Sequence, residues 1–149
     1  MPETATINEM AQILAASLVL AAPDRQLLPG LPFLMDAALA AVRAEDVFPE
    51  RMRLQLRFVE DEDFGVKCVE WSAIREELAA CFLIEYPPWG ARADHPYKIV
   101  ATPFVARALL RDLDISEEQA RAWGERLWQG LDGAERTVRN RVTRLVEMV

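Results

Sequence analysis

The 149-residue sequence has one histidine, two cysteines and no glycine-rich loop, and these absences restrict the chemistry available to it. His95 alone cannot form a histidine-based metal cluster, and Cys68 and Cys81 lack the spacing of a zinc site. The six glycines are scattered along the chain, so none of them marks a phosphate-binding loop. We therefore expect no catalytic residues, no metal and no cofactor.

One enzymatic alternative remains open. Asp94 and His95 would have to meet Cys81 to form a nucleophile–base pair, and nothing in the sequence places these residues together. This hypothesis predicts that Cys81 reacts with a thiol probe in the folded protein.

Long hydrophobic segments are also lacking. Residues 11–22 are almost wholly apolar, but this stretch is too short to span a bilayer. Glu3 and Glu9 precede it without any lysine or arginine, whereas a secretory signal has a positively charged beginning. We interpret the stretch as a buried helix of a cytoplasmic protein that does not enter membranes. Two unpaired cysteines agree with a reducing compartment.

Basic residues are fewer than acidic residues. The chain has 17 basic and 24 acidic residues, a net charge of −7, and Lys67 and Lys98 are its only lysines. A field of this sign repels nucleic-acid phosphates and anionic membranes, and it favours a partner with a basic surface.

The length suits one globular domain over residues 1–149. We predict an α+β fold of five to six helices packed on a small antiparallel sheet built around one β-hairpin. Capping residues and apolar spacing of three to four place helices at residues 6–21, 32–43, from 72 onward, 103–112, 116–130 and 132–149. The first of these is apolar beyond one face, which suggests burial or homodimerisation.

Alternating apolar and polar residues predict a strand at residues 51–59, and a second strand at 66–71 returns after an acidic turn. Arg51, Arg53 and Arg57 would project from the first strand, either toward an anionic ligand or toward acidic groups of the same fold. Residues 81–86 fit a strand or a helix equally well, and a third strand is possible at 97–101.

Candidate partner-binding residues combine aromatic and acidic side chains. Tryptophan and tyrosine are favoured anchors at protein interfaces, and the acidic turn would suit a basic partner. The candidates are Trp89, Tyr97, Trp123, Glu60, Asp61, Glu62 and Asp63.

The C-terminal region supports a different hypothesis. Residues 116–149 could form a helical hairpin joined at Gly130–Gly133, and its second helix carries Arg136, Arg139, Arg141 and Arg144. Such a hairpin could read DNA in the manner of a helix-turn-helix. However, the basic and acidic residues of this region balance, and the arginines spread around the helix. The same helix has an apolar stripe of Val138, Val142, Leu145, Val146 and Val149.

Taken together, the sequence favours a non-enzymatic protein-binding module, such as an adaptor, an inhibitor of the immunity-protein type or a small regulatory subunit. A homodimer is possible, and nucleic acid is the less favoured partner. The alternative is a DNA-binding regulator that uses the hairpin at residues 116–149.

Overall fold

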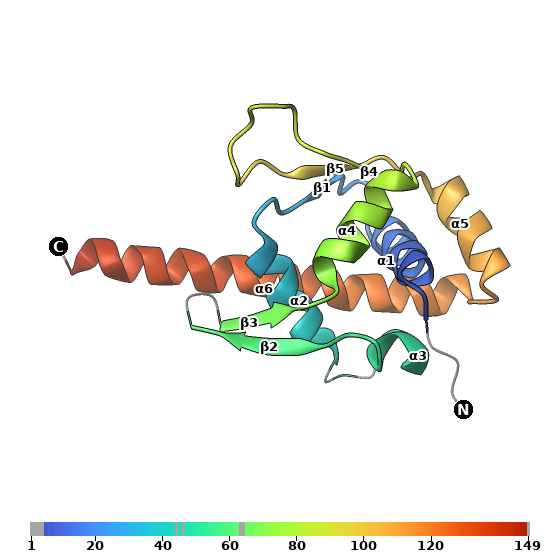
Figure 1. The fold of residues 1–149 in the computed structure, drawn as a ribbon, viewed down its shortest axis with the longest axis horizontal. Coiled ribbons are helices and arrows are strands. Elements are labelled where there is room, and N and C mark those ends of the chain that lie inside the picture. The colour runs from blue at the N-terminus through green and yellow to red at the C-terminus, as the bar shows by residue number, and fades with distance from the viewer. Residues whose placement is uncertain (1–4, 44, 46, 63–64, 149) are drawn as a thin grey trace.

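The computed structural model describes residues 5–43, 45, 47–62 and 65–148. Within them the elements follow the order α1 (Ile7–Ala21), β1 (Leu27–Leu28), α2 (Pro32–Arg43), α3 (Glu50–Arg53), β2 (Phe58–Asp61), β3 (Gly65–Cys68), α4 (Trp71–Ala80), β4 (Ile84–Glu85), β5 (Tyr97–Ile99), α5 (Pro103–Asp112) and α6 (Glu117–Glu147). The predicted α+β fold is confirmed, with helices dominant (Figure 1).

The strands form two small antiparallel sheets. One sheet has the order β1–β5–β4, with Leu27 opposite Lys98 and Ile84 opposite Ile99. The other is the predicted hairpin, β2–β3, in which Phe58 pairs with Cys68. Residues 81–86, which the sequence left open, therefore include a short strand.

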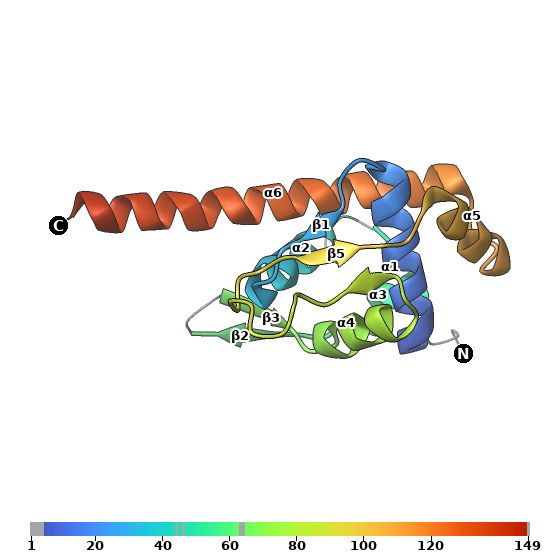
Figure 2. The ribbon, with the colours of Figure 1, turned by 90° about the horizontal axis from the view of Figure 1, so that it is seen from above.

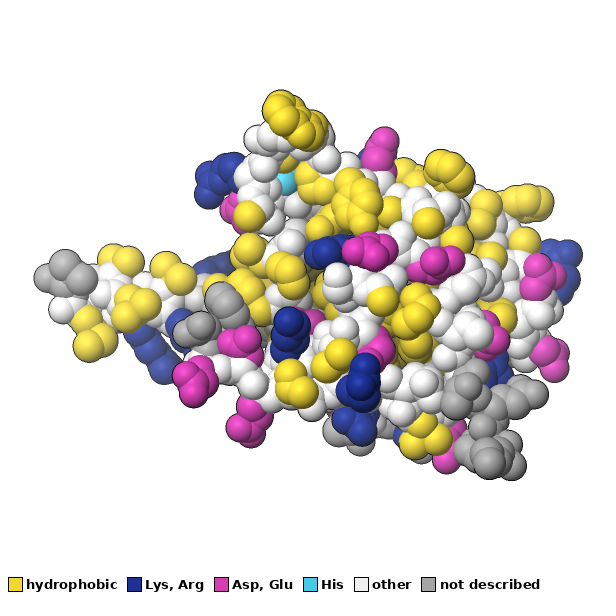
Figure 3. Space-filling model, viewed as in Figure 1, with side chains coloured by type: hydrophobic (Ala, Val, Ile, Leu, Met, Phe, Trp, Pro, Cys, Tyr) yellow, Lys and Arg dark blue, Asp and Glu magenta, His cyan; other side chains and the backbone are white. Residues whose placement is uncertain are grey.

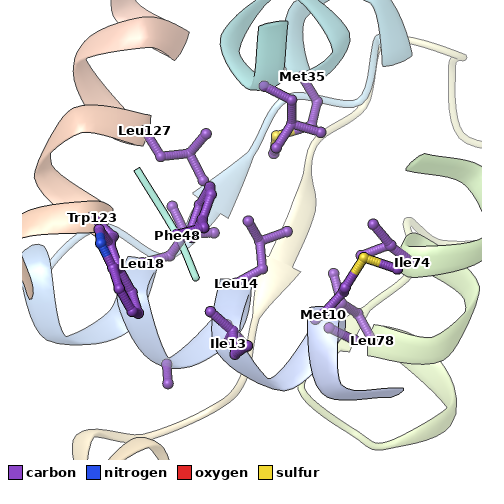
Figure 4. Packing of buried hydrophobic residues seen from close by; sticks show 14 of the residues in the cluster. Met10, Ile13, Leu14, Leu18, Met35, Phe48, Ile74, Leu78, Trp123 and Leu127 are labelled. Carbon is purple, nitrogen blue, oxygen red and sulfur yellow. The ribbon is translucent and has the colours of Figure 1, made fainter. Parts of the chain in front are cut away.

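Helix α1 lies at the centre of the molecule, and α4, α5 and α6 pack around it (Figure 2). Ten of its fifteen residues are buried. Met10 points toward Ile74 and Leu78 of α4, while Leu18 lies on the side of Phe48 and α6 (Figure 4). The predicted burial of α1 is confirmed. Because the apolar side chains of α1 are buried by other elements of the same chain, they are not exposed for the homodimerisation that the sequence suggested.

Three helix starts follow directly from the sequence. Thr6, Thr102 and Ser116 each accept a hydrogen bond from the backbone amide three residues further on, at 3.1–3.2 Å. Each bond satisfies an amide that has no partner within its helix. These caps place α1, α5 and α6 at the starts predicted for them.

The predicted strand at residues 51–59 is largely wrong, because its first half forms the helical turn α3. The amide of Leu54 donates to the carbonyl of Glu50, and that of Leu56 donates to Arg53. Met52 and Leu56, four residues apart, are buried, whereas Leu54 is 57% exposed. The alternating pattern therefore coincides with a helical spacing, and only residues 58–61 are a strand.

The predicted break at Gly130–Gly133 is also wrong, since α6 is one continuous helix of 31 residues. Asp132 does not cap a new helix, because both of its oxygens accept hydrogen bonds from Arg25, at 3.0 and 3.1 Å. Gly130 packs against the backbone of Ala38 in α2. These contacts hold the glycine-containing turns in the helix.

Candidate interaction surfaces

The residues of the enzymatic alternative lie in unreactive settings. The Cys81 sulfur is 3.4 Å from both Asn8 Nδ2 and Glu77 Oε1. Burial raises the pKa of the Cys81 thiol, and the nearby Glu77 carboxylate raises it further, so the thiol stays protonated at neutral pH. His95 is exposed, and its Nδ1 lies 3.0 Å from the carbonyl oxygen of Pro96. Burial raises the pKa of Cys68 to about 11.

In the part of the chain that the structure describes, no group of three or more His, Cys, Asp or Glu residues could hold a metal ion. The helices of that part include none long and apolar enough to cross a membrane.

Trp123, predicted as a partner contact, belongs to the core. It is 8% exposed, and its ring centroid lies 6.0 Å from that of Phe48. Trp128 is buried as well, and its indole N–H donates to the carbonyl of Leu18 at 3.0 Å. The prediction for Trp123 is wrong because the sides of α6 that carry Trp123 and Trp128 both pack against the rest of the chain.

The two other aromatic candidates differ in their surroundings. Trp89 projects from the loop between β4 and β5 and is fully exposed, at 103%. Tyr97 is half-buried, with an edge-on contact to Tyr86 at a centroid distance of 5.6 Å. The guanidinium carbon of Arg75 lies 5.7 Å from the Tyr97 centroid. Trp89 is therefore open to a partner, whereas Tyr97 is engaged within the fold.

The acidic candidates lie at the end of the hairpin. Glu60 and Asp61 belong to β2, and Glu62 starts the turn, while Asp63 falls outside the described residues. Glu60 and Glu62 are exposed, and Asp61 is half-buried. The structure does not bring this group together with Trp123.

The three arginines predicted to project from one strand bind within the fold instead. Arg51 pairs with Glu9 at 3.3 Å, and Arg57 pairs with the buried Glu70 at 2.8 Å. Arg53 donates to the carbonyl of Phe48 at 3.3 Å. The intramolecular alternative is thus the correct one, although the partners of Arg51 and Arg57 are not the acidic turn.

The C-terminal part of α6, residues 134–147, extends beyond the rest of the molecule, and we call it the α6 tip (Figures 1 and 2). Val142, Leu145 and Val146 are 54%, 64% and 69% exposed. At 100° per residue they lie on the same helix face as the buried Leu127 and Leu131. The face that forms core in the first half of α6 therefore continues into solvent.

The four predicted nucleic-acid contacts also lie on the α6 tip and are exposed. Arg139 and Arg141 flank the apolar stripe on opposite sides, and Arg136 and Arg144 lie farther round the helix. Figure 3 shows hydrophobic and basic side chains along the projecting helix. Because α6 is continuous, these arginines are not on the recognition helix of a hairpin, and that part of the DNA-binding hypothesis is wrong.

A cleft of about 420 Å³ opens at the base of the α6 tip. Leu31, Leu34 and Val138 contribute apolar walls, while Asp94, Glu135 and Arg139 contribute charged groups, and Asp94 pairs with Arg92 at 3.2 Å. The cleft thus borders the apolar stripe and has charges of both signs at its rim. Sequence reasoning identified the stripe but had no signal for the cleft, which joins three distant segments.

A second hollow, of about 310 Å³, lies between α2 and the hairpin. Asp36 lines it, is 5% exposed, and has one carboxylate oxygen without a hydrogen-bond partner. Burial raises the pKa of Asp36, against the opposing effects of the Cys68 backbone, Lys67 and Arg75. Nothing in the sequence distinguished this aspartate from the other residues of α2.

No match was found when the chain was compared with protein-family models, with curated proteins and with solved structures.

Proposed function

We propose that this chain is a non-enzymatic protein-binding module whose principal binding surface is the apolar stripe of the α6 tip. The supporting observation is the continuity of that stripe with the core face of the same helix. Val142, Leu145 and Val146 are half to two-thirds exposed. Burying exposed apolar side chains of this kind against a partner lowers the free energy of the complex.

The proposal covers an adaptor, an inhibitor or a regulatory subunit in a reducing, cytoplasmic setting. Cys68 and Cys81 are free thiols, which suits that compartment. The acidic remainder of the molecule favours a partner with a basic surface. Trp89, fully exposed, is a candidate second anchor.

Site-specific photo-crosslinking tests the proposed surface. A photoreactive phenylalanine analogue at position 142 should give protein adducts in lysate from cells that express the chain. The matched control is the same analogue at Asn140, which is exposed and lies almost half a turn around the helix. Equal adducts at both positions, or none at position 142, would refute the surface. Adducts that vanish with nuclease would favour nucleic acid instead.

A further inference from the structure

We propose that the partner of the α6 tip is a second copy of this chain, in an antiparallel homodimer. In this dimer the two tips lie along each other, and the end of each tip enters the cleft at the base of the other copy's tip. The inference rests on the proposed function, because it uses the same surface and names what covers it.

The apolar stripe supplies the helix–helix contact. Viewed down the helix axis, the side chains of Val142, Leu145 and Val146 each lie within about 60° of their common mean direction. They therefore form a narrow seam of the kind that pairs two helices. The α6 tip that carries the seam covers about four turns, or roughly 21 Å of helix. A second copy offers an identical seam, which makes the contact self-complementary about a two-fold axis.

The cleft determines the direction of pairing. With the two-fold axis near Val142, residue 146 of one copy lies level with residue 138 of the other, because helix positions are counted in opposite directions. Val138 lines the cleft, next to Leu31 and Leu34. The end of each tip therefore reaches an apolar pocket in the partner. A parallel pair would leave both clefts empty.

Charge favours the same arrangement. The α6 tip has four arginines and two glutamates, a charge of +2, so a chain of net charge −7 carries −9 elsewhere. Antiparallel pairing brings each basic tip to the acidic remainder of the other copy. Parallel pairing would instead set the two acidic remainders side by side.

The contact of the tip end with the cleft is needed for a stable interface. Two strips about 21 Å long and 10 Å wide are small beside the roughly 1,200 Å² at which stable interfaces begin. The walls of the cleft and the neighbouring loop add area on both sides of the dimer.

Sedimentation equilibrium of the purified full-length protein tests the dimer. The wild type should sediment with the mass of two chains, and Val142→Glu should raise the dissociation constant by ~100-fold or more by placing a charge in the seam. Asn140→Glu adds the same charge on the opposite side and should leave the constant unchanged. Circular dichroism of both variants verifies the helix content. A monomeric wild type at all concentrations, or a dimer unaffected by Val142→Glu, would overturn the inference.

Disulfide cross-linking tests the antiparallel register. Val138→Cys and Val146→Cys chains, mixed under oxidising conditions, should form a disulfide between the two variants, because residues 138 and 146 of opposite copies lie level in the antiparallel dimer. Disulfides that form only between identical variants would overturn the antiparallel arrangement.

The two proposals fail in different ways. If the purified chain is monomeric but the photoreactive group at position 142 captures a different protein, the homodimer is refuted and the binding surface stands. If that group captures nothing, both are refuted.

Discussion

At the residue scale, Gly124 sets the distance between the two central helices. A Cβ atom at this position would collide with the carbonyl oxygen of Ser17 in α1, so only glycine allows α6 to approach α1 as it does. Gly133, nine residues further along the same helix, has open space around it, with nothing within 4 Å of such a Cβ.

Gly124→Ala should therefore destabilise the fold by about 3 kcal/mol or more, because one of the two helices must shift. Gly133→Ala, the matched control, should stabilise the protein by roughly 0.5–1 kcal/mol through helix propensity. Urea unfolding at one fixed protein concentration measures both. Equal effects of the two changes would refute a close contact at Gly124.

A second residue-scale prediction concerns Asp36. Because burial raises its pKa above the ordinary value of 3.8, the ionised carboxylate costs stability in the folded state. This cost is absent below the pKa of the unfolded chain and grows as pH rises toward the folded pKa. Asp36→Asn removes it, so the variant should gain stability relative to the wild type between pH 4 and pH 7.

The measurement is the free energy of unfolding of both proteins across that pH range. Glu76→Gln, at an exposed position of α4, is the control and should show little such gain. A difference for Asp36→Asn that does not change with pH would contradict the assignment.

At the element scale, Glu70 joins the hairpin to α4. Its carboxylate accepts hydrogen bonds from the backbone amide and the side chain of Arg57, and Glu70 itself is buried. Glu70→Ala leaves that amide without its partner and should cost about 1–3 kcal/mol. Glu60→Ala, on the exposed face of β2, should change the stability by less than ~0.5 kcal/mol. Thermal unfolding that shows similar losses for both would count against this role.

The elements differ in how well the sequence predicted them. Helices with a capping residue and a steady apolar spacing, such as α1 and α5, are local structures and were predicted closely. The errors arise where distant contacts decide. Arg25 binds Asp132, which is therefore not the cap of a new helix. The burial of Met52 and Leu56 makes a helical turn of an alternating segment.

The candidate surfaces follow the same rule. The stripe on α6 is a periodic property of one segment, so the sequence reveals it. Whether a stripe is covered depends on where the rest of the chain lies. For this reason the sequence predicts Trp123 as a surface residue, although it is buried. The cleft could not be predicted, because its walls come from residues 29–34, 94–96 and 135–139.

At the scale of the whole molecule, the proposed dimer should couple stability to concentration. Association of folded chains stabilises the native state by mass action, so the melting temperature of the wild type should rise with protein concentration. A chain that ends at residue 139 keeps every buried residue of α6, the last of which is Leu131. Its melting temperature should not depend on concentration.

Differential scanning calorimetry over a hundredfold concentration range makes this comparison. A truncated chain that fails to fold would show that the α6 tip supports the core, contrary to its exposure in the structure.

The projecting helix also determines how the protein moves through solvent. A body with a rod attached has more frictional drag than a sphere of equal mass, so a single copy has an enlarged Stokes radius and leaves a gel-filtration column early. Two such bodies joined by overlapping rods have the outline of a dumbbell. Small-angle X-ray scattering would register that outline as two separate maxima in the distribution of interatomic distances, one from within each body and one from between them.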